Sequence, residues 1–393
     1  MTDVLESEGV RHDPTLANLD ASVSFVQRAM VVMDHTLTFP EKIQEQVSKG
    51  LAVMLQTKSI TAENVDAVAA LPDRSRIILI TDDIEPPLLE QGHLSRMVQM
   101  AINAGMPPLE ALAAATVRPA RHLGLRDLGA IAPGYHADFM VMDDLTTYPP
   151  GEVFVQGHLA ATNGNIIASD CPELPPLPEY PAVPGSLTIE DFRLVVSEDP
   201  PEEVIFNAAA LQNDRNSLTI LEKVQIVIDS GYAVFSEGDD LVLTAIFARN
   251  GSSHMVGVLK GTGLTGGAFA SSLSHDSHNL LVVGRDVQSM HRAAQAVYDM
   301  GGGVAVGHRE EVVASLPLPY FGLLSDEAVP QVARDLSAIE DRLRASGMRH
   351  QRPFLLLSVI GLSVSPYVKF TDKGIVDTER RCLLPAWEKA SIS

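Results

Sequence analysis

The chain has 393 residues, of which 46% are hydrophobic and 20% charged, and its formal net charge is −21. This length and composition are typical of a globular protein with a sizeable core and two or three domains. The excess of acidic residues argues against a phosphate-binding surface for nucleic acid, which needs Lys and Arg in excess, and fits a small neutral or cationic partner.

The two cysteines, Cys171 and Cys382, lie far apart in the sequence and in no CxxC pair. They predict neither a disulfide framework nor a zinc–thiolate site, and they suit a reducing compartment. Residues 1–13 are acidic and lack the apolar run of a signal peptide. The sequence has no run of about 18 apolar residues, so it predicts no membrane span. We therefore expect a cytoplasmic protein with no membrane partner.

Short apolar runs alternate with helical segments over residues 29–118. Pro40 suits the first turn of one of these helices, and Thr61 is a plausible cap of the next. This order is typical of βα units, whose strands deliver polar residues to the carboxyl end of a (β/α)8 barrel. Three units do not close a barrel, so we expect a partial one. The predicted elements are strands over 29–36, 51–59 and 76–83 and helices over 40–50, 61–71, 91–104 and 107–118.

The pattern changes after residue 129, where short strands separated by Gly, Pro and Asp turns predict a small antiparallel β unit. Residues 172–185 contain six prolines and predict a semi-rigid linker. The remainder predicts an α+β domain, with helices over 286–300 and 328–346. The expected division is an α/β barrel part over 1–145, the β unit and linker over 146–185, and the α+β domain over 186–393.

Asp82 and Asp83 end the apolar run of residues 76–83. A carboxylate at a barrel mouth can bind a divalent metal or take a proton from an attacking water. A pair of aspartates at this place can equally cap the following helix or turn, which is its more common role when the pair is considered alone.

His35 ends the first apolar run, AMVVMDHT. A neutral imidazole is a common ligand of Zn, Fe and Mn, and the end of a strand is a suitable place for one. The simpler alternative is a histidine hydrogen-bonded to a backbone carbonyl.

The segment SSLSHDSHN places His275, Asp276, His278 and Asn279 within five residues, after the glycine-rich stretch 260–270. Two imidazoles and a carboxylate beside an apolar strand are more than solvation alone explains. The glycines do not have GxGxxG spacing, and no capped helix follows them, so they do not predict a nucleotide site.

Taken in order, these segments resemble adenine deaminases of the amidohydrolase superfamily. The stretch from ITDD at residue 80 to MDDL at residue 145 is similar to the region around the last barrel strand of that family. The segments GLTGGAFASSLSHDSHNLLVVG, MGGGVAV, LPLPYFGLLSDE and KFTDKGIVD resemble the adenine deaminase C-terminal domain. The resemblance runs from about Met30 to Asp377.

The resemblance implies roles for individual residues. Asp82 matches the aspartate after barrel strand eight, a metal ligand and proton carrier in a metal-dependent hydrolase barrel. MDHT resembles the SDHE segment of the family, so His35 is implied as a metal ligand, whereas Thr36 stands where the family has glutamate. The HxH of the first barrel strand has no counterpart in this sequence. We therefore expect the C-terminal two-thirds of such a protein, with weak or absent activity on its own.

The reaction implied by the family is hydrolysis of adenine to hypoxanthine and ammonia through metal-activated water, with Mn or Fe as the expected metal and Zn as an alternative. His275, Asp276 and His278 would lie over the substrate or support the site. We expect a small-molecule purine substrate and a homo-oligomer. The alternatives are a non-catalytic remnant that acts as a binding module, or a partner subunit whose barrel is completed by another chain.

Overall fold

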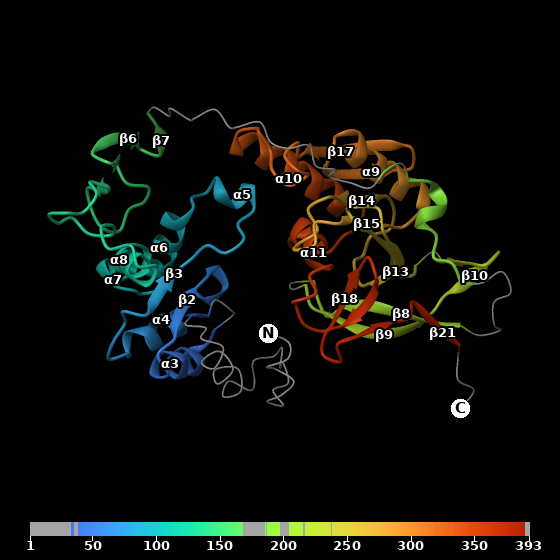
Figure 1. Cartoon of the computed structure of the whole chain (residues 1–393), viewed down its shortest axis with the longest axis horizontal. Coiled ribbons are helices and arrows are strands. Elements are labelled where there is room, and N and C mark those ends of the chain that lie inside the picture. The colour runs from blue at the N-terminus through green and yellow to red at the C-terminus, as the bar shows by residue number, and fades with distance from the viewer. Residues whose placement is uncertain are drawn as a thin grey trace. The chain divides into compact units, whose positions relative to one another are not determined.

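A computed structural model describes residues 33–34, 38–167, 185, 187–196, 204–214, 217–236 and 238–389 (Figure 1). The chain divides into two compact units, Met1–Leu174 and Pro175–Ser393. Among the described residues, no helix has both the length and the apolar character needed to cross a bilayer. The expected three-part division of the chain stays a prediction.

The first unit is built on a small parallel sheet with strand order β1-β2-β3. The strands pair in parallel, with Met33 opposite Ala52 and Val53 opposite Ile77. Helices lie between the strands in sequence, so the predicted alternation of strands and helices is confirmed for these elements. They are β1 (Met33–Asp34), α3 (Pro40–Ser48), β2 (Ala52–Leu55), the 3-10 turn η1 (Thr57–Ser59), α4 (Ala62–Ala69) and β3 (Ile77–Leu79).

Local sequence explains where these helices start. Pro40 occupies the first position of α3, where its missing N–H breaks no helical hydrogen bond. The Thr61 side chain accepts a hydrogen bond from the backbone N–H of Asn64 at 3.2 Å, which confirms Thr61 as the cap of α4. The apolar faces of both helices pack on the strands. The buried residues of this core include Ile43, Val53, Leu55, Val65, Val68, Ile77 and Leu79.

Four helices follow β3, where the sequence predicted two. They are α5 (Pro86–Leu89), α6 (Leu94–Asn103), α7 (Pro108–Ala115) and α8 (Val117–His122). The predicted helix over 107–118 is interrupted at Thr116, whose φ of −130° and ψ of −87° leave the helical region. The Thr116 hydroxyl donates to the carbonyl of Leu112 at 2.7 Å, a bond that offers the backbone an alternative to the helical pattern.

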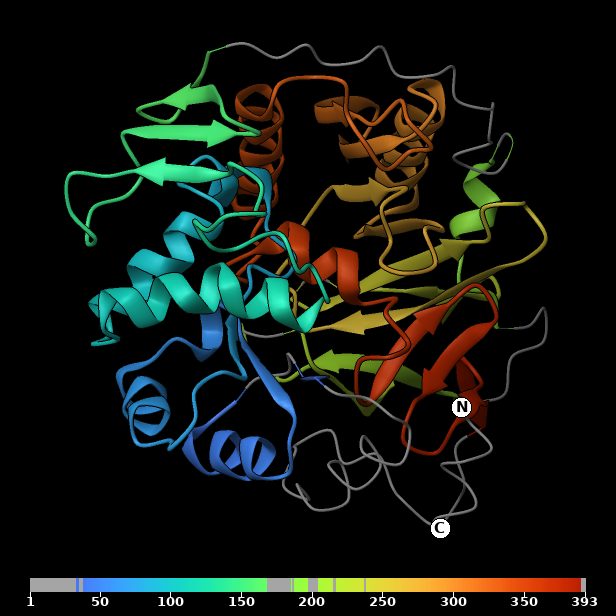
Figure 2. The same ribbon diagram turned by 60° about the vertical axis from the view of Figure 1, so that its left-hand side comes forward.

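The predicted small antiparallel β unit is confirmed as a four-stranded sheet with the order β4-β5-β6-β7 (Figure 2). Positive φ angles at Gln156–Gly157 and at Asn163–Gly164 match the two-residue hairpin turns that join β5 to β6 and β6 to β7. Phe139 and Phe154 face each other across two strands, with ring centroids 4.6 Å apart. The strands are β4 (Phe139–Val141), β5 (Glu152–Val155), β6 (His158–Thr162) and β7 (Asn165–Ile166).

The second unit is organised by a nine-stranded sheet with the order β17-β16-β14-β15-β12-β13-β8-β21, in which β9 also pairs with β8. All pairs are antiparallel except β13 with β8. The strands are β8 (Val204–Leu211), β9 (Thr219–Gln225), β12 (Leu241–Phe247), β13 (His254–Lys260), β14 (Ala268–Ser271), β15 (Leu280–Gly284), β16 (Gly303–His308), β17 (Glu311–Pro317) and β21 (Trp387–Lys389).

This sheet is covered on both faces. Met290 and Val297 of α9 (Val287–Asp299) lie in the apolar core on one face. The core on the other face contains residues of α10 (Val329–Ala345) and α11 (Pro353–Val359), including Ile339 and Leu356. The second unit is therefore mixed α and β, as the sequence predicted, and the helices over 286–300 and 328–346 are confirmed within one residue at each end.

Shorter elements complete the second unit. They are η2 (Ile189–Phe192), the hairpin of β10 (Val227–Asp229) and β11 (Tyr232–Val234), and the sheet of β18 (Val368–Thr371), β19 (Gly374–Asp377) and β20 (Cys382–Leu384). The sequence did not predict β8, β14, β17, α11 or the strands after residue 360. The run VIFNAAAL of β8 is rich in alanine, a helix-favouring residue, so only its partners in the sheet make it a strand.

Gly284 provides a test of how tightly α9 packs on the sheet. A Cβ at this position would lie 2.5 Å from Met290 Cγ and 2.6 Å from Ala268 Cβ, closer than side chains approach. We expect Gly284→Ala to lower the free energy of unfolding by about 1–3 kcal/mol through overpacking. Urea denaturation measures this change. The matched control is Gly266→Ala, where the nearest atom is 3.7 Å away, and equal stabilities of the two variants would contradict the packing.

Candidate active site

The carboxyl ends of β1, β2 and β3 meet at one edge of the parallel sheet, because parallel strands end on the same side. Asp34 is the last residue of β1, and Asp82 follows β3 by three residues. The implied metal ligand His35 and the departure at Thr36 lie outside the described residues. At this edge, the structure therefore describes Asp34, Asp82 and the residues around them.

Asp82 is exposed and has a backbone φ of 57°, an uncommon left-handed conformation for a residue other than glycine. One of its carboxylate oxygens, Oδ1, accepts a hydrogen bond from the backbone N–H of Asp83 at 3.0 Å. The next helix, α5, begins only at Pro86 and has no side-chain cap. Asp82 therefore does not cap that helix, and its exposed carboxylate follows β3 at the carboxyl edge of the sheet.

His93 lies close to the residue before Asp82. Its Nε2 atom is 3.3 Å from the Thr81 hydroxyl oxygen, and the tautomer decides which of the two donates. Gly92, with a φ of 117°, sets the turn that brings this imidazole to the start of α6. His93 was not among the predicted site residues. The sequence signal for its place beside Thr81 is the GH pair that follows β3 and the TDD segment.

Asp34 is held from α3 by two side chains one helical turn apart. Lys42 Nζ lies 3.0 Å from Asp34 Oδ2, and Gln46 Nε2 donates to the same oxygen at 2.6 Å. The Lys42 side chain is only 2% exposed and that of Asp34 17%. This ion pair, which fixes the end of β1, was not predicted. Its sequence signal is the i, i+4 spacing of Lys42 and Gln46 on the helix after the strand.

The described residues do not form a metal site by themselves. Within the described ranges, no three His, Cys, Asp or Glu side chains converge to hold an ion. A catalytic zinc site usually has three protein ligands. Asp82 would be one donor, so the described donor set does not fit the implied metal, and no chemical step through a metal follows from it.

The HDSHN loop, residues 275–279, belongs to the second unit and joins β14 to β15. His275 Nδ1 lies 2.8 Å from Asp276 Oδ1, so the carboxylate orients the imidazole. The backbone N–H of His275 donates to the carbonyl of Ser358 at 2.9 Å, and that of His278 to Ser274 at 2.6 Å. His275 and Asp276 are thus paired, and His278 is fixed through its backbone, all in a different compact unit from Asp82.

His278 combines a left-handed backbone with a partly buried ring. Its φ is 51°, and its Nδ1 atom is buried and has no hydrogen-bond partner among the residues that the structure describes. Burial lowers the pKa of His278 below its ordinary value, the charges of Arg249 and His275 lower it further, and Asp276 only partly opposes them. The imidazole is therefore neutral at pH 7, the form that can accept a proton.

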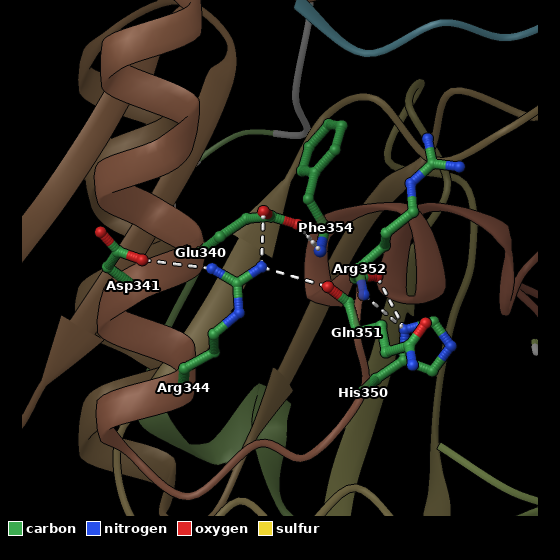
Figure 3. A network of polar contacts seen from close by, with 7 residues as sticks. All are labelled: Glu340, Asp341, Arg344, His350, Gln351, Arg352 and Phe354. Atoms are coloured by element: carbon green, nitrogen blue, oxygen red, sulfur yellow. Dashed lines mark hydrogen bonds and ion pairs between the residues drawn. The ribbon is translucent and has the colours of Figure 1, made fainter. Parts of the chain in front are cut away.

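A polar network fixes the start of α11, the helix whose Ser358 carbonyl accepts from the His275 N–H (Figure 3). Arg344 on α10 contacts Glu340 at 2.9 Å and donates to the carbonyl of Gln351 at 3.2 Å. Glu340 in turn accepts from the backbone N–H of Phe354, in the first turn of α11, at 3.4 Å. A carboxylate there is favourable, because the N–H groups of the first helical turn have no helical partner.

Comparisons with known proteins give matches over both units. The chain matches the adenine deaminase C-terminal domain over residues 216–382 and the amidohydrolase family over residues 7–171. It is 32% identical over 378 residues to the adenine deaminase of Desulfatibacillum aliphaticivorans, covering 93% of this chain and 64% of that protein. It is 30% identical over 421 residues to the adenine deaminase of Oleidesulfovibrio alaskensis, covering 98% and 70%. The chain thus spans about two thirds of the length of these relatives.

The lowered pKa of His278 predicts an acid-sensitive contribution to stability. The folded chain favours the neutral ring, so this contribution is present above the ordinary pKa of about 6.5 and is lost as the pH falls through the lower folded value. We expect the melting temperature of His278→Asn to fall less than that of the native chain between pH 7.5 and pH 4.5. Asparagine suits the left-handed backbone. The exposed His308→Asn is the control, and parallel curves for all three proteins would contradict the assignment.

Proposed function

The chain belongs to the adenine deaminase family of amidohydrolases, and from this we propose that it binds adenine and acts in its hydrolysis to hypoxanthine and ammonia. The observation that supports the proposal is similarity to adenine deaminases along 93% of the chain, through both the barrel-type part and the C-terminal domain. Because the chain spans 64% of the length of such a relative, the activity of the whole protein remains a proposal for this chain.

In the proposed reaction, Asp82 is the residue that transfers the proton. A water oxygen forms a bond to C6 of the purine, the bond from C6 to the exocyclic nitrogen breaks, and ammonia leaves. The Asp82 carboxylate takes a proton from the water and delivers it to the leaving nitrogen, as a positioned general base and acid. Its exposure at the carboxyl edge supports this role.

We propose a divalent cation, Mn or Fe with Zn as an alternative, as the cofactor of the whole protein. Such an ion makes water a nucleophile near neutral pH. Asp82 and His35 are the proposed ligands, although the described residues do not complete a donor set. Further donors would have to come from outside the described ranges, either from this polypeptide or from a second chain that completes the barrel.

His275, Asp276 and His278 are proposed to contact the purine or to support its binding. The Asp276 carboxylate, 2.8 Å from His275 Nδ1, holds that ring so that it can exchange a proton with a ligand. A small purine fits the acidic chain better than a nucleic acid does, since the net charge is −21. A cytoplasmic homo-oligomer is part of the same proposal.

A binding module is the second candidate, favoured by the lack of three converging metal donors among the described residues. It differs from the first candidate in one measurable respect: it binds purine without releasing ammonia.

The test uses the purified full chain with Mn²⁺, Fe²⁺ or Zn²⁺ added. Calorimetry measures adenine binding, and a coupled assay measures ammonia. We expect binding together with weak or absent release by the chain alone, because too few donors converge. Detectable ammonia release with any of the three metals, however weak, supports the deaminase, whereas binding without any release under all three metals supports the binding module. If adenine does not bind, the proposed function is wrong.

The adjacent aspartates give a matched pair of variants for any preparation that releases ammonia. Asp82→Asn removes the proposed proton carrier and should lower kcat by about 100-fold or more. Asp83→Asn has the same change of charge one residue further on, and we expect kcat within about threefold of the native value. Equal effects of the two substitutions would show that the role belongs to neither residue in particular.

A further inference from the structure

The HDSHN loop meets two other loops of the second unit, and the side chains of Asn279 and Asp372 tie the three loops together. Asn279 was noted in the sequence motif, and neither residue was a predicted site residue. The loops are residues 248–253 between β12 and β13, residues 272–279 between β14 and β15, and residues 372–373 between β18 and β19. We propose that Asn279 and Asp372 are positioning residues that hold His275 and His278 for the purine. The inference rests on the proposed function of those histidines.

Asn279 is 8% exposed and uses both ends of its side-chain amide. Its Oδ1 atom accepts a hydrogen bond from the backbone N–H of Arg249 at 3.1 Å. Its Nδ2 atom donates to Asp372 Oδ1 at 3.2 Å. One buried amide therefore connects the HDSHN loop to both neighbouring loops.

Asp372 receives hydrogen bonds on both carboxylate oxygens. While Oδ1 accepts from Asn279, Oδ2 accepts from the Ser253 hydroxyl and lies 3.2 Å from Lys373 Nζ. Lys373 Nζ also donates to Ser253 Oγ at 2.7 Å. Burial by itself would raise the pKa of Asp372, but the bonds from Ser253 and Lys373 outweigh it and lower the pKa. The carboxylate is therefore ionised at neutral pH, and its hydrogen bonds are of the stronger, charge-assisted kind.

The network matters for the histidines because Asn279 directly follows His278 and directly precedes β15. All five residues of β15 are buried in the sheet, so Asn279 sits at a rigid boundary. The left-handed backbone of His278, with φ 51°, persists only where surrounding contacts hold it. The contacts of Asn279 supply that restraint on one side, and the hydrogen bond from the His278 N–H to the Ser274 carbonyl supplies it on the other.

The opposing explanation is that the network only joins three hairpins and has no effect on the imidazoles. A structural role of this kind would change the melting temperature alone. A positioning role would also change the environment of His278, which is set by burial and by Arg249, His275 and Asp276, and would change the affinity for adenine.

The experiment compares Asp372→Asn with the native full chain. Nuclear magnetic resonance measures the pKa of His278, calorimetry measures adenine affinity, and thermal unfolding measures stability. Loss of the carboxylate frees the loop and exposes the ring, so we expect the pKa of His278 to rise toward its ordinary value. Adenine affinity should weaken by about threefold or more. Asp326→Asn, at an exposed bend of the same unit, should leave both quantities unchanged.

Ser253→Ala removes a single hydrogen bond to Asp372 and serves if Asp372→Asn does not fold. Smaller changes in the same directions are expected for it. A lower melting temperature with an unchanged pKa of His278 and unchanged adenine affinity would overturn the positioning role. If the native chain binds no adenine, the proposed function fails, while the pKa of His278 still decides whether the network controls the imidazole.

Discussion

Every residue of β12 is buried, because this strand lies inside the nine-stranded sheet with an apolar layer on each face. Val242 and Ile246 enter the layer below α10 and α11, and Leu243 and Ala245 enter the layer below α9. This alternation fixes the register, because a slip by one residue would exchange the two faces. The loops at the ends of β12 and of its neighbours are therefore held at fixed places, and the polar groups of the HDSHN loop depend on that placement.

The two units present their polar residues in different ways. In the first unit, the parallel strands end at a common edge, and the ion pair of Asp34 with buried Lys42 fixes one of those ends. Burying a charge is costly unless it is paired, so this pair specifies the local arrangement more than it adds stability. In the second unit, the Asp276 carboxylate contacts the His275 ring directly, whereas backbone carbonyls and the Asn279 amide fix the loop backbone. The charged groups Asp372 and Lys373 stand one contact further away.

Much of the fold could be predicted where a single segment carries its own signal. The Gly, Pro and Asp turns after residue 129 predicted the small antiparallel β unit, and the segment 328–346 predicted α10. Elements whose state is set by neighbours could not be predicted in the same way. The alanine-rich β8 is a strand because β9, β13 and β21 pair with it, and the helix over 107–118 is interrupted where Thr116 bonds to its own backbone.

The sequence by itself determined the family, the order of strands and helices in the first unit, and the residues that could do chemistry, because motifs and periodicity are local properties of the chain. The tertiary structure decided which of these residues have defined partners. It showed that Asp82 does not cap the following helix and that His275 is paired with Asp276. It also connected Asn279 to Asp372 across 93 positions of sequence. Contacts over such separations depend on strand pairing and on burial, which no local pattern encodes. For the same reason, the buried lysine beside Asp34 became visible only once α3 was packed on its sheet.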